Sequence, residues 1–587
     1  MQKLTIAIIV GITFFVGISL MSLYAHLGSF IVQAQPFNVR GLLVNLTDEH
    51  HNWKPSKSTN VTQTNGNLTI SIITEKPKKI FNRAFLQTQL NTSNTALPIL
   101  TLDYASKNFL YPPTKKPTFQ IEIRDVNNTK ILWSAILQDT SGKLLSEIFT
   151  LPSNVLNKPI NFRIYIITEG GPSHSTVSLK NLYVYRFESS YEGGPIITDP
   201  NLKLETFFKG LKFPTSMAFL GPNDLLVLEK NNGTVQRIIN GTLQPKPVLD
   251  VNVAIQSERG MEGIALTKNH STGKTYVFLY FTETKSEDGE KGSFYRDLGN
   301  RLYRYELDGD KLVNPKLLLD LPSQPCCIHN GGKITIGPDN NVYTVIGDAN
   351  GHHTKAQNFK NGKDPDGTSA IYRFTQDGKV VSPTLLGDKE PLNKYYAYGI
   401  RNSFGLDFDP VTGNLWDTEN GAGAGDEINL VEPGFNSGWT MLQGIWNVNA
   451  SHPNSLGKIE SSNHDNLVDF DGRGKYSDPE FTWSFGGVGV TAVKFFNSTK
   501  FGKQYENDMF VGDYHRGYLY HFDLSKERDK LNLDGSLRDK VADNITELQK
   551  TIFGQGFGPI TDIKVGPDGY LYVLTYQGTI YRLVPSL

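Results

Sequence analysis

The chain has 587 residues, too many for a single hydrophobic core, so we expect two or three domains. Its 58 Lys and Arg residues nearly balance its 59 Asp and Glu residues. This balance excludes the basic surplus typical of nucleic-acid-binding proteins and the acidic excess of a disordered tail. Gly, Tyr and Phe are plentiful and Met is scarce, a composition that favours an all-β protein with many tight turns over helical bundles.

The N-terminal segment is apolar over a length sufficient to cross a membrane. Leu4–Leu23 carries no charge, and about 20 apolar residues are enough to cross a bilayer. Val32-Gln33-Ala34 also has the small-residue pattern of a signal-peptide cleavage site. We predict that residues 1–35 are a signal peptide or a membrane anchor, with the anchor favoured because a secretory signal has a shorter apolar core. The rest of the chain is then extracytoplasmic, either membrane-anchored or secreted.

Asn-x-Ser/Thr sequons agree with export and with a glycoprotein. They begin at Asn45, Asn60, Asn67, Asn91, Asn127, Asn232, Asn240, Asn269, Asn449, Asn497 and Asn544. In so Asn-rich a chain about half of them are expected by chance, so they support export without establishing it.

Residues 36–188 alternate apolar and polar side chains in short runs, such as Phe119-Gln120-Ile121-Glu122-Ile123. Turn-forming clusters such as Asp125-Val126-Asn127-Asn128 separate the runs. Many short strands at this spacing predict a β-sandwich-like domain. It carries no recognisable catalytic motif, and residues 189–200, with Gly193-Gly194-Pro195, are predicted to be a linker.

From residue 201 to residue 587 one pattern returns six times: an apolar strand, a turn rich in Pro, Asp and Gly, and a second apolar strand. The copies begin at Ser216, Gly263, Ile334, Gly405, Thr491 and Asp562. Several copies add a third strand of the form Leu302-Tyr303-Arg304-Tyr305. Because one small sheet cannot bury both its faces, such a repeat predicts a radial array, here a six-bladed β-propeller around a central channel.

Three motifs fall beside the predicted strands, where they can gather at one mouth of the channel. They are His329-Asn330-Gly331-Gly332, Tyr398-Gly399-Ile400-Arg401-Asn402, and Glu419-Asn420-Gly421 followed by Gly425-Asp426-Glu427-Ile428-Asn429. In this order they resemble the glucose/sorbosone dehydrogenase family, whose studied members use pyrroloquinoline quinone (PQQ) and calcium. The resemblance covers about two-thirds of the chain, from Leu202 to Leu587.

The resemblance implies a role for each motif. Oxidation of a sugar hydroxyl needs a base to take the proton, and a histidine titrates near neutral pH. In the family the residue that matches His329 is this base, and hydride passes to the quinone. The glycines after it would let a flat ligand approach the backbone. The alternative is that His329 only bonds a turn.

Planar donors suit the carboxylates of the quinone. The resemblance places Arg401 and Asn402 on the cofactor, and Glu258 and Asn420 where the family has further cofactor contacts. The alternative for Arg401 is an ion pair between blades.

Calcium prefers hard oxygen ligands, including carbonyls of glycine-rich turns. Gly421 and Ala422 match the carbonyls that hold the cofactor-bridging calcium in the family, where the ion acts as a Lewis acid. Asp426 and Glu427 add carboxylates, and Glu427 matches a ligand of a second, structural calcium. The alternative is a glycine turn with solvated acids.

The sequence departs from the family at the quinone carboxylates. Arginines are expected just before the last strand pair, but Pro559 and Thr561 stand there, and a lysine expected in the fifth blade is replaced by His515. Losing about two charged hydrogen bonds, at ~1.5–3 kcal/mol each, would weaken binding of an anionic cofactor.

Cys326 and Cys327 are the two cysteines of the chain and lie just before His329. Outside the cytoplasm adjacent cysteines can form a vicinal disulfide, with either a redox or a purely structural role. Together with His329 they could instead bind a soft metal such as copper. The pair His352-His353 is expected on a solvent-exposed loop.

The leading hypothesis is PQQ- and calcium-dependent oxidation of a sugar or related alcohol or aldehyde, with His329 as general base. Electrons would pass to an external acceptor, since no dinucleotide-binding motif is present. The alternative is a non-catalytic extracellular propeller that binds glycan or protein. A less favoured hypothesis is a calcium-dependent hydrolase such as a lactonase.

Overall fold

The computed structural model describes residues 194–586 except 270–271, 286–296, 325–326, 423, 450–451, 457–465 and 486–487, and, before residue 194, Asn127 and the strands. The chain divides into two compact units, Met1–Ser190 and Tyr191–Leu587. The anchor or signal peptide predicted for residues 1–35 lies outside the described residues. In the part that is described, no helix is long and apolar enough to cross a membrane.

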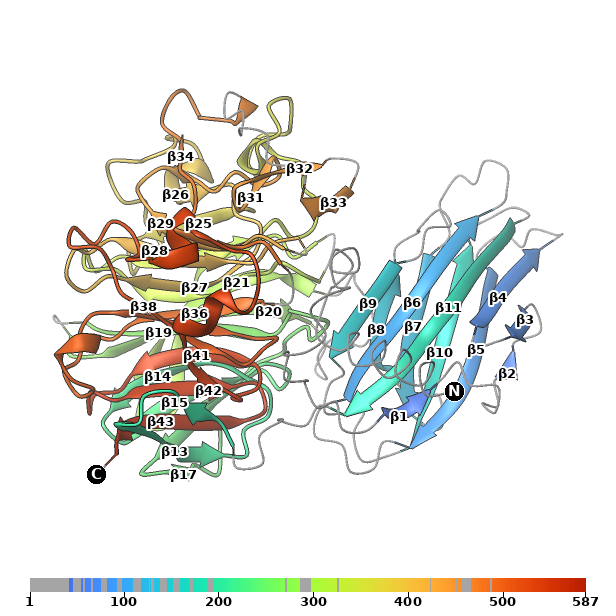
Figure 1. Cartoon of the computed structure of the whole chain (residues 1–587), viewed down its shortest axis with the longest axis horizontal. Coiled ribbons are helices and arrows are strands. Elements are labelled where there is room, and N and C mark those ends of the chain that lie inside the picture. Colours follow the sequence, from blue (N-terminus) through green and yellow to red (C-terminus); the bar gives the residue numbers. More distant parts are fainter. Residues whose placement is uncertain are drawn as a thin grey trace. The chain divides into compact units, whose positions relative to one another are not determined.

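The N-terminal unit contains two antiparallel sheets (Figure 1). One has the order β3-β4-β11-β6-β9 with β1 paired to β11, and the other has the order β2-β5-β10-β7-β8. The strands are β1 (Leu42–Asn45), β2 (Lys54–Pro55), β3 (Thr59–Thr64), β4 (Asn67–Thr74), β5 (Asn82–Asn91), β6 (Pro98–Asn108), β7 (Thr118–Asp125), β8 (Ile131–Leu137), β9 (Leu145–Thr150), β10 (Pro159–Thr168) and β11 (Ser173–Arg186). The predicted alternation is visible in β7, where Phe119, Ile121 and Ile123 are buried.

The C-terminal unit contains six larger sheets, each built around one sequence repeat, and one small three-stranded sheet (Figure 1). The first is β14 (Pro214–Gly221), β15 (Asp224–Glu229), β16 (Thr234–Ile239), β17 (Thr242–Leu243) and β18 (Leu249–Asp250). The second is β19 (Met261–Lys268), β20 (Thr275–Thr284), β21 (Asp297–Asp308) and β22 (Lys311–Leu321). The third is β23 (Ile334–Ile336), β24 (Val342–Ile346), β25 (Ala370–Phe374) and β26 (Tyr395–Tyr398), extended by the short strands β30 (Phe435–Asn436) and β34 (Lys475–Tyr476).

The fourth sheet is β27 (Ser403–Phe408), β28 (Leu415–Glu419), β29 (Asp426–Val431), β35 (Phe481–Trp483) and β39 (Val541–Ala542). The fifth is β36 (Val490–Phe495), β37 (Met509–Asp513), β38 (Leu519–Phe522), β40 (Ile552–Gln555) and β12 (Ile196–Ile197). The sixth is β41 (Ile560–Val565), β42 (Leu571–Thr575), β43 (Thr579–Pro585) and β13 (Leu202–Lys209). A small additional hairpin comprises β31 (Leu442–Gln443), β32 (Trp446–Asn449) and β33 (His452–Leu456). The helical segments described are short 3₁₀ turns such as Lys355–Gln357.

The six sheets close into a ring. The first strand of each sheet contacts the first strand of the next, in the order β14, β19, β23, β27, β36 and β41, and β41 returns to β14. The last sheet is completed by β13, from the start of the unit, which pairs antiparallel with the C-terminal strand β43. The segment predicted as a linker therefore enters the propeller at Ile196–Ile197, where β12 pairs with β40. The architecture is the six-bladed β-propeller expected from the repeats.

A buried ion pair lies among the first strands. The Nζ atom of Lys333 donates to the carboxylate of Asp562, which also accepts hydrogen bonds from the Ser216 hydroxyl at 2.8 Å and from the Met217 N–H at 2.9 Å. Burial would raise the pKa of Asp562, but the charges of Lys333 and Lys564 hold it below its ordinary value. These residues come from blades 1, 3 and 6, so the ion pair and its hydrogen bonds connect three blades of the ring.

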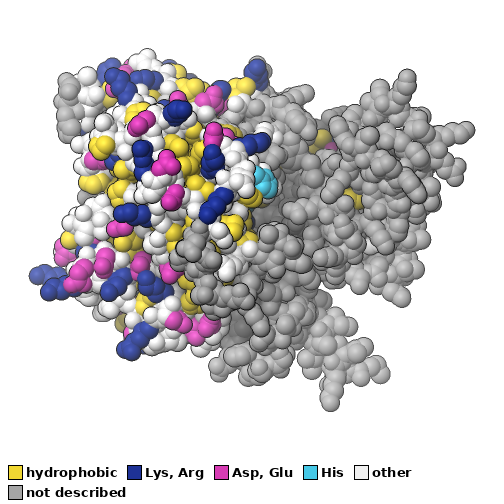
Figure 2. Space-filling view, turned by 90° about the horizontal axis from the view of Figure 1, so that it is seen from above, with side chains coloured by type: hydrophobic (Ala, Val, Ile, Leu, Met, Phe, Trp, Pro, Cys, Tyr) yellow, Lys and Arg dark blue, Asp and Glu magenta, His cyan; other side chains and the backbone are white. Residues whose placement is uncertain are grey.

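The described outer surface carries both charge signs. On the face shown in Figure 2, Lys and Arg side chains are interspersed with Asp and Glu side chains. This mixture matches the balanced composition and shows no basic patch on that face of the kind that binds nucleic acid.

Candidate active site at the mouth of the propeller

The blade geometry explains why the sequence motifs meet. In each blade the first two strands are antiparallel, so the residues before the first strand lie beside the residues after the second. In blade 3 this places the segment before β23, which contains His329, next to Asp348, which follows β24. In blade 4 it places Arg401, before β27, next to Glu419 at the end of β28.

His329 is held by a carboxylate that the motif did not include. Its Nδ1 lies 2.5 Å from Asp348 Oδ1, and both side chains are less than 10% exposed. The backbone of His329 is left-handed, with φ = +61°, a conformation that costs energy for a non-glycine residue. With Nδ1–H donating to Asp348, the Nε2 atom of His329 is the ring nitrogen left to accept a proton.

Asp348 is itself fixed by several donors. Trp439 Nε1–H donates to Oδ2 at 2.7 Å, and the N–H of Asn350 donates to Oδ1 at 2.8 Å. Burial alone would raise the pKa of Asp348, but His329, Arg401 and the hydrogen bond from Asn350 lower it to about 2. Asp348 is therefore a buried anion that orients the His329 ring.

Glu258 links blade 2 to blades 3 and 4. Its Oε2 accepts the N–H of His329 at 2.5 Å, and the amide of Asn402 lies 3.3 Å from its Oε1. Glu258, predicted as a cofactor contact, thus holds the backbone of His329 in place. Nearby Glu262, which the sequence analysis did not include, has its pKa raised to about 8 by burial and by the charge of Glu258, against the opposing effect of Lys230.

Arg401 lies in the same group of residues. Its Nη1 donates to the carbonyl of Asn420 at 2.8 Å, and its guanidinium lies 5.3 Å from the Trp439 ring centre. Desolvation lowers the pKa of Arg401, while the charges of Asp348, Glu258 and other acids oppose that shift. Arg401 therefore lies among acids of blades 2, 3 and 4, and its alternative role in an ion pair between blades stays open.

Several buried polar atoms of this group have no hydrogen-bond partner among the described residues. They are Arg401 Nε, Asn402 Oδ1 and Asn330 Nδ2. Buried polar groups are nearly always satisfied in folded proteins, so a cluster of unsatisfied ones at a channel mouth is typical of a ligand site. The amide of Asn420, by contrast, is engaged with the backbone carbonyls of Asn402 and Val490 at 3.2 and 3.0 Å.

A second group of acids lies on one face of blade 4. The antiparallel register pairs Asp417 with Asn429 and Glu419 with Glu427, and all four side chains are buried. Burial raises the pKa of Asp417 to about 7 and that of Glu427 to about 8, and it raises the pKa of Glu419 as well. Both carboxylate oxygens of Asp417, Oδ1 of Asn429 and Oε1 of Gln443 lack a hydrogen-bond partner among the described residues.

This oxygen-rich cluster has the chemistry that Ca²⁺ prefers. Three buried carboxylates repel one another unless a cation or protons neutralise them. The predicted metal residue Glu427 belongs to the cluster, where Gln443 Nε2 donates to it at 2.9 Å. Asp417 and Glu419 extend the group beyond the residues that the sequence analysis named.

The glycine turn between β28 and β29 is organised by Asp426. Its carboxylate accepts the N–H groups of Gly421 and Gly489, both at 2.7 Å, and burial raises its pKa. A Cβ at Gly421 would lie 2.1 Å from the Ala424 carbonyl, so only glycine fits this turn. Asp426 therefore shapes the turn whose carbonyls, at Gly421 and Ala422, are predicted to bind calcium. Ala422 is buried beside it.

The glycines after His329 serve packing. A Cβ at Gly331, whose φ is +63°, would lie 2.4 Å from the Val345 carbonyl, and one at Gly332 would lie 2.6 Å from the Glu262 Cβ. These contacts come from β24 of the same blade and from β19 of blade 2, and the expectation that the glycines admit a flat ligand stays a prediction.

His515 lies close to the same turn, since a Cβ at Gly489 would be 2.5 Å from its ring. Desolvation and the Arg516 charge lower the pKa of His515, which favours the neutral ring. At the positions of the missing arginines, the Thr561 hydroxyl donates to the Pro214 carbonyl at 3.0 Å, and the Pro559 carbonyl accepts the Tyr576 N–H. None of these residues supplies a positive charge.

Cys327 is buried, and its carbonyl accepts the N–H of Glu258 at 3.1 Å. Cys326 lies outside the described residues, so the vicinal disulfide stays a prediction.

The expectation of an exposed histidine pair is wrong for His352. Its ring is 16% exposed, with Nδ1 2.5 Å from Asp366 Oδ2 and Nε2 bonded to the Gln324 carbonyl, because the loop folds back over the segment that precedes the cysteines.

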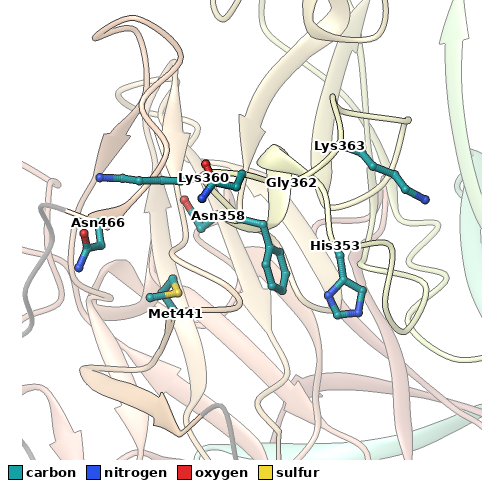
Figure 3. A pocket seen from close by; sticks show the side chains of 9 residues that line it. His353, Asn358, Lys360, Gly362, Lys363, Met441 and Asn466 are labelled. Atoms are coloured by element: carbon teal, nitrogen blue, oxygen red, sulfur yellow. The ribbon is translucent and has the colours of Figure 1, made fainter.

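His353 is exposed and lines a pocket of about 540 Å³. Figure 3 shows Met441 and Asn466 on one side of this pocket and His353 on the other. None of the predicted site residues lines it. It is therefore distinct from the His329 group, although Met441 follows Trp439 by two residues.

Comparison with known proteins agrees with the fold and the motifs. The sequence profile of the family described as Glucose / Sorbosone dehydrogenase matches residues 211–582. Aldose sugar dehydrogenase YliI of Escherichia coli (strain K12) is 24% identical over 395 residues, which cover 65% of this chain and 93% of that protein. Quinoprotein glucose dehydrogenase B of Acinetobacter calcoaceticus is 28% identical over 268 residues, 42% of this chain and 53% of that protein.

Among solved structures, one described as a crystal structure of glucose dehydrogenase superimposes with a TM-score of 0.51 at 22% identity. The match covers 65% of this chain and 99% of that chain. This likeness supports the fold of the C-terminal unit. The repeats, the ring of six sheets, the convergence of the three motifs and the profile match over most of the propeller show that the chain belongs to the Glucose / Sorbosone dehydrogenase family.

Proposed function

We propose that the propeller oxidises a sugar or a related alcohol or aldehyde at its mouth, with PQQ and Ca²⁺ as cofactors. The observation that carries the proposal is the His329–Asp348 pair, a histidine with one nitrogen bound to a buried carboxylate, beside unsatisfied polar atoms of Arg401 and the two asparagines. The relatives named above are described as aldose sugar dehydrogenase and quinoprotein glucose dehydrogenase, which supports the same substrate class.

The residues present fit such a cofactor in part. Arg401 and Asn402 would hold the quinone through polar atoms that lack partners, and the Gly421–Ala422 turn and the acids around Glu427 would hold calcium. The Pro559 and Thr561 positions give the quinone carboxylates no cation, so we expect weaker binding than arginines would give. Bound PQQ would supply the hydride acceptor, and Ca²⁺ would supply a Lewis acid.

The chain's own residues carry the proton transfer. Nε2 of His329 accepts the proton of the substrate hydroxyl as hydride leaves the carbon. Asp348 keeps the Nδ1–H tautomer and stabilises the imidazolium that forms, while Glu258 fixes the backbone of His329 through its N–H. The low exposure of His329 and Asp348 limits competition from water.

We also propose that the reaction takes place outside the cytoplasm and passes electrons to an external acceptor. The uncharged segment Leu4–Leu23 and the sequons support this location. The membrane would be reached through the N-terminal segment.

The deciding experiment is calorimetric titration of the full chain with PQQ in calcium-containing buffer, together with dye reduction by aldoses. We expect binding that is weakened in Arg401→Ala, and dye reduction that is lost in His329→Ala and kept in His353→Ala, an exposed histidine of the separate pocket. No binding at high micromolar PQQ would overturn the proposal. It would leave a propeller that recognises glycan or protein through the same mouth, the alternative that the replaced arginines favour.

A further inference from the structure

A second group of ligand-type side chains lies away from the mouth, on the outer part of blade 5. Asp508 precedes β37, His521 lies in β38 and Asp523 follows β38. The antiparallel register pairs Phe510 with His521 and Met509 with Phe522, so Asp508 and Asp523 occupy the next pair. Because side chains alternate along strands, His521, Asp508 and Asp523 share one face of the hairpin.

The three side chains converge on one point. His521 Nε2 lies 2.9 Å from Asp508 Oδ2 and 3.5 Å from Asp523 Oδ1, and one ligand atom of each residue lies within 4.8 Å of the others. Ligands placed about 2.1 Å from a transition metal are about 3.0 Å apart at right angles and about 3.4 Å apart at the tetrahedral angle. The observed separations are those of neighbouring ligands of one ion.

The imidazole of His521 lies between the two aspartates. One nitrogen of His521 faces two carboxylates, yet it carries at most one hydrogen and can donate well to only one of them. Among the described residues no Lys or Arg forms an ion pair with either aspartate.

The imidazole is held in place before any ion binds. Its ring centre lies 5.2 Å from that of Tyr505, 5.1 Å from that of Phe510 and 5.8 Å from that of Phe553. The backbone N–H of His521 donates to the Thr551 carbonyl at 2.8 Å. Fixing a ligand ring in this way lowers the entropy lost on metal binding.

We propose that Asp508, His521 and Asp523 form a binding site for a divalent transition-metal ion of the Zn²⁺ class, separate from the site at the mouth. One imidazole nitrogen and two carboxylate oxygens are a donor set that such ions accept. The side chain of Asp523 is 55% exposed, so water can complete the coordination. The ion would cross-link strands β37 and β38 of the hairpin.

The test uses the full chain, stripped of metal and then held in excess Ca²⁺ so that the oxygen sites are filled. Zn²⁺ is titrated calorimetrically into wild type, His521→Ala, Asp523→Asn and the control His352→Ala, which removes a histidine paired with a single carboxylate. We expect one Zn²⁺ site to disappear in His521→Ala and to weaken by about tenfold or more in Asp523→Asn, while His352→Ala matches wild type.

The same ion should raise the thermal unfolding midpoint of wild type and of the His352→Ala control, but not that of His521→Ala. Equal Zn²⁺ stoichiometry and affinity in wild type and in both site variants would overturn the proposal. If His521→Ala does not fold, Asp523→Asn decides, because that side chain is largely in solvent. Neither Zn²⁺ titration nor thermal unfolding measures sugar oxidation at the mouth. A negative result for the metal site is therefore distinguishable from a negative result for the proposed function.

Discussion

Replacing Asp348 by Asn tests the proposal that the buried carboxylate enables His329 to accept a proton. The substitution keeps the size of the side chain and removes its charge. In the folded chain the pKa of Asp348 is about 2, against an ordinary value of 3.8, although burial alone would raise it. His329, Arg401 and the Asn350 N–H therefore outweigh burial and lower the pKa by a net of roughly 2 units, or about 2.5 kcal/mol.

The same interaction energy stabilises a protonated His329 and the Arg401 charge. If the full interaction energy stabilises the transition state, Asp348→Asn should slow sugar oxidation by about 50- to 100-fold at saturating substrate. The assay is dye reduction by the PQQ- and Ca²⁺-loaded chain over a range of pH. Asp366→Asn is the matched control, because Asp366 bonds the other buried histidine, His352, and should leave the rate unchanged.

Stability gives a second readout that does not need the cofactor. Because the pKa of Asp348 is lower in the folded than in the unfolded chain, its stabilisation is fully present above about pH 4 and is lost as the pH falls toward 2. The difference in unfolding free energy between wild type and Asp348→Asn should thus approach about 2.5 kcal/mol at pH 7 and shrink below pH 4. A folded Asp348→Asn chain with the wild-type rate and pH profile would refute the reasoning.

Three further outcomes are expected. Arg401→Lys should weaken PQQ binding by about tenfold in calorimetry, because an ammonium cannot reproduce the planar fork, and unchanged affinity would contradict the assignment. Lys333→Met should cost up to about 3–5 kcal/mol in denaturant unfolding, because it removes the buried cation that donates to Asp562 and leaves that carboxylate only Lys564, at 3.6 Å. Lys203→Met, in an exposed pair, should cost at most about 1 kcal/mol. Chelation of Ca²⁺ should lower the thermal midpoint of wild type more than that of Glu427→Gln, which keeps the Gly421–Ala422 turn, and an equal response of the two would argue against calcium in the acid cluster.

Local sequence was enough for the strands and for the number of blades. Apolar runs interrupted by Pro-Asp-Gly turns define hairpins, and six copies require a closed array because no single sheet can bury both faces. The third strand of blade 2, with Leu302 and Tyr303, was predicted from the same reasoning and lies in β21. The closing of the ring by β13 was not predicted, because a strand of eight residues gives no indication of which distant strand it pairs with.

The sequence predicted the motif residues of the site but not the buried acids around them. His329, Arg401 and Glu427 were visible as members of motifs, but Asp348 stands alone in the sequence, 19 residues after His329. The signal that could have found it is positional: an acid just after the second strand of a blade lies beside the residues just before the first. Asp417 was missed because, in sequence, an acid inside a strand looks like a solvent-facing residue.

The sequence by itself determined the repeats, the glycine turns and the motif residues, because these depend on strand periodicity and backbone conformation over a few neighbouring positions. Only the tertiary structure decided which side chains share a charge or a proton. The pairing of His329 with Asp348, the cross-strand group of Asp417 with Glu427, and the convergence of His521 with two aspartates depend on strand register. Electrostatic interactions in a protein interior are set by separations of a few ångströms and by burial, and neither can be read from spacing along the chain.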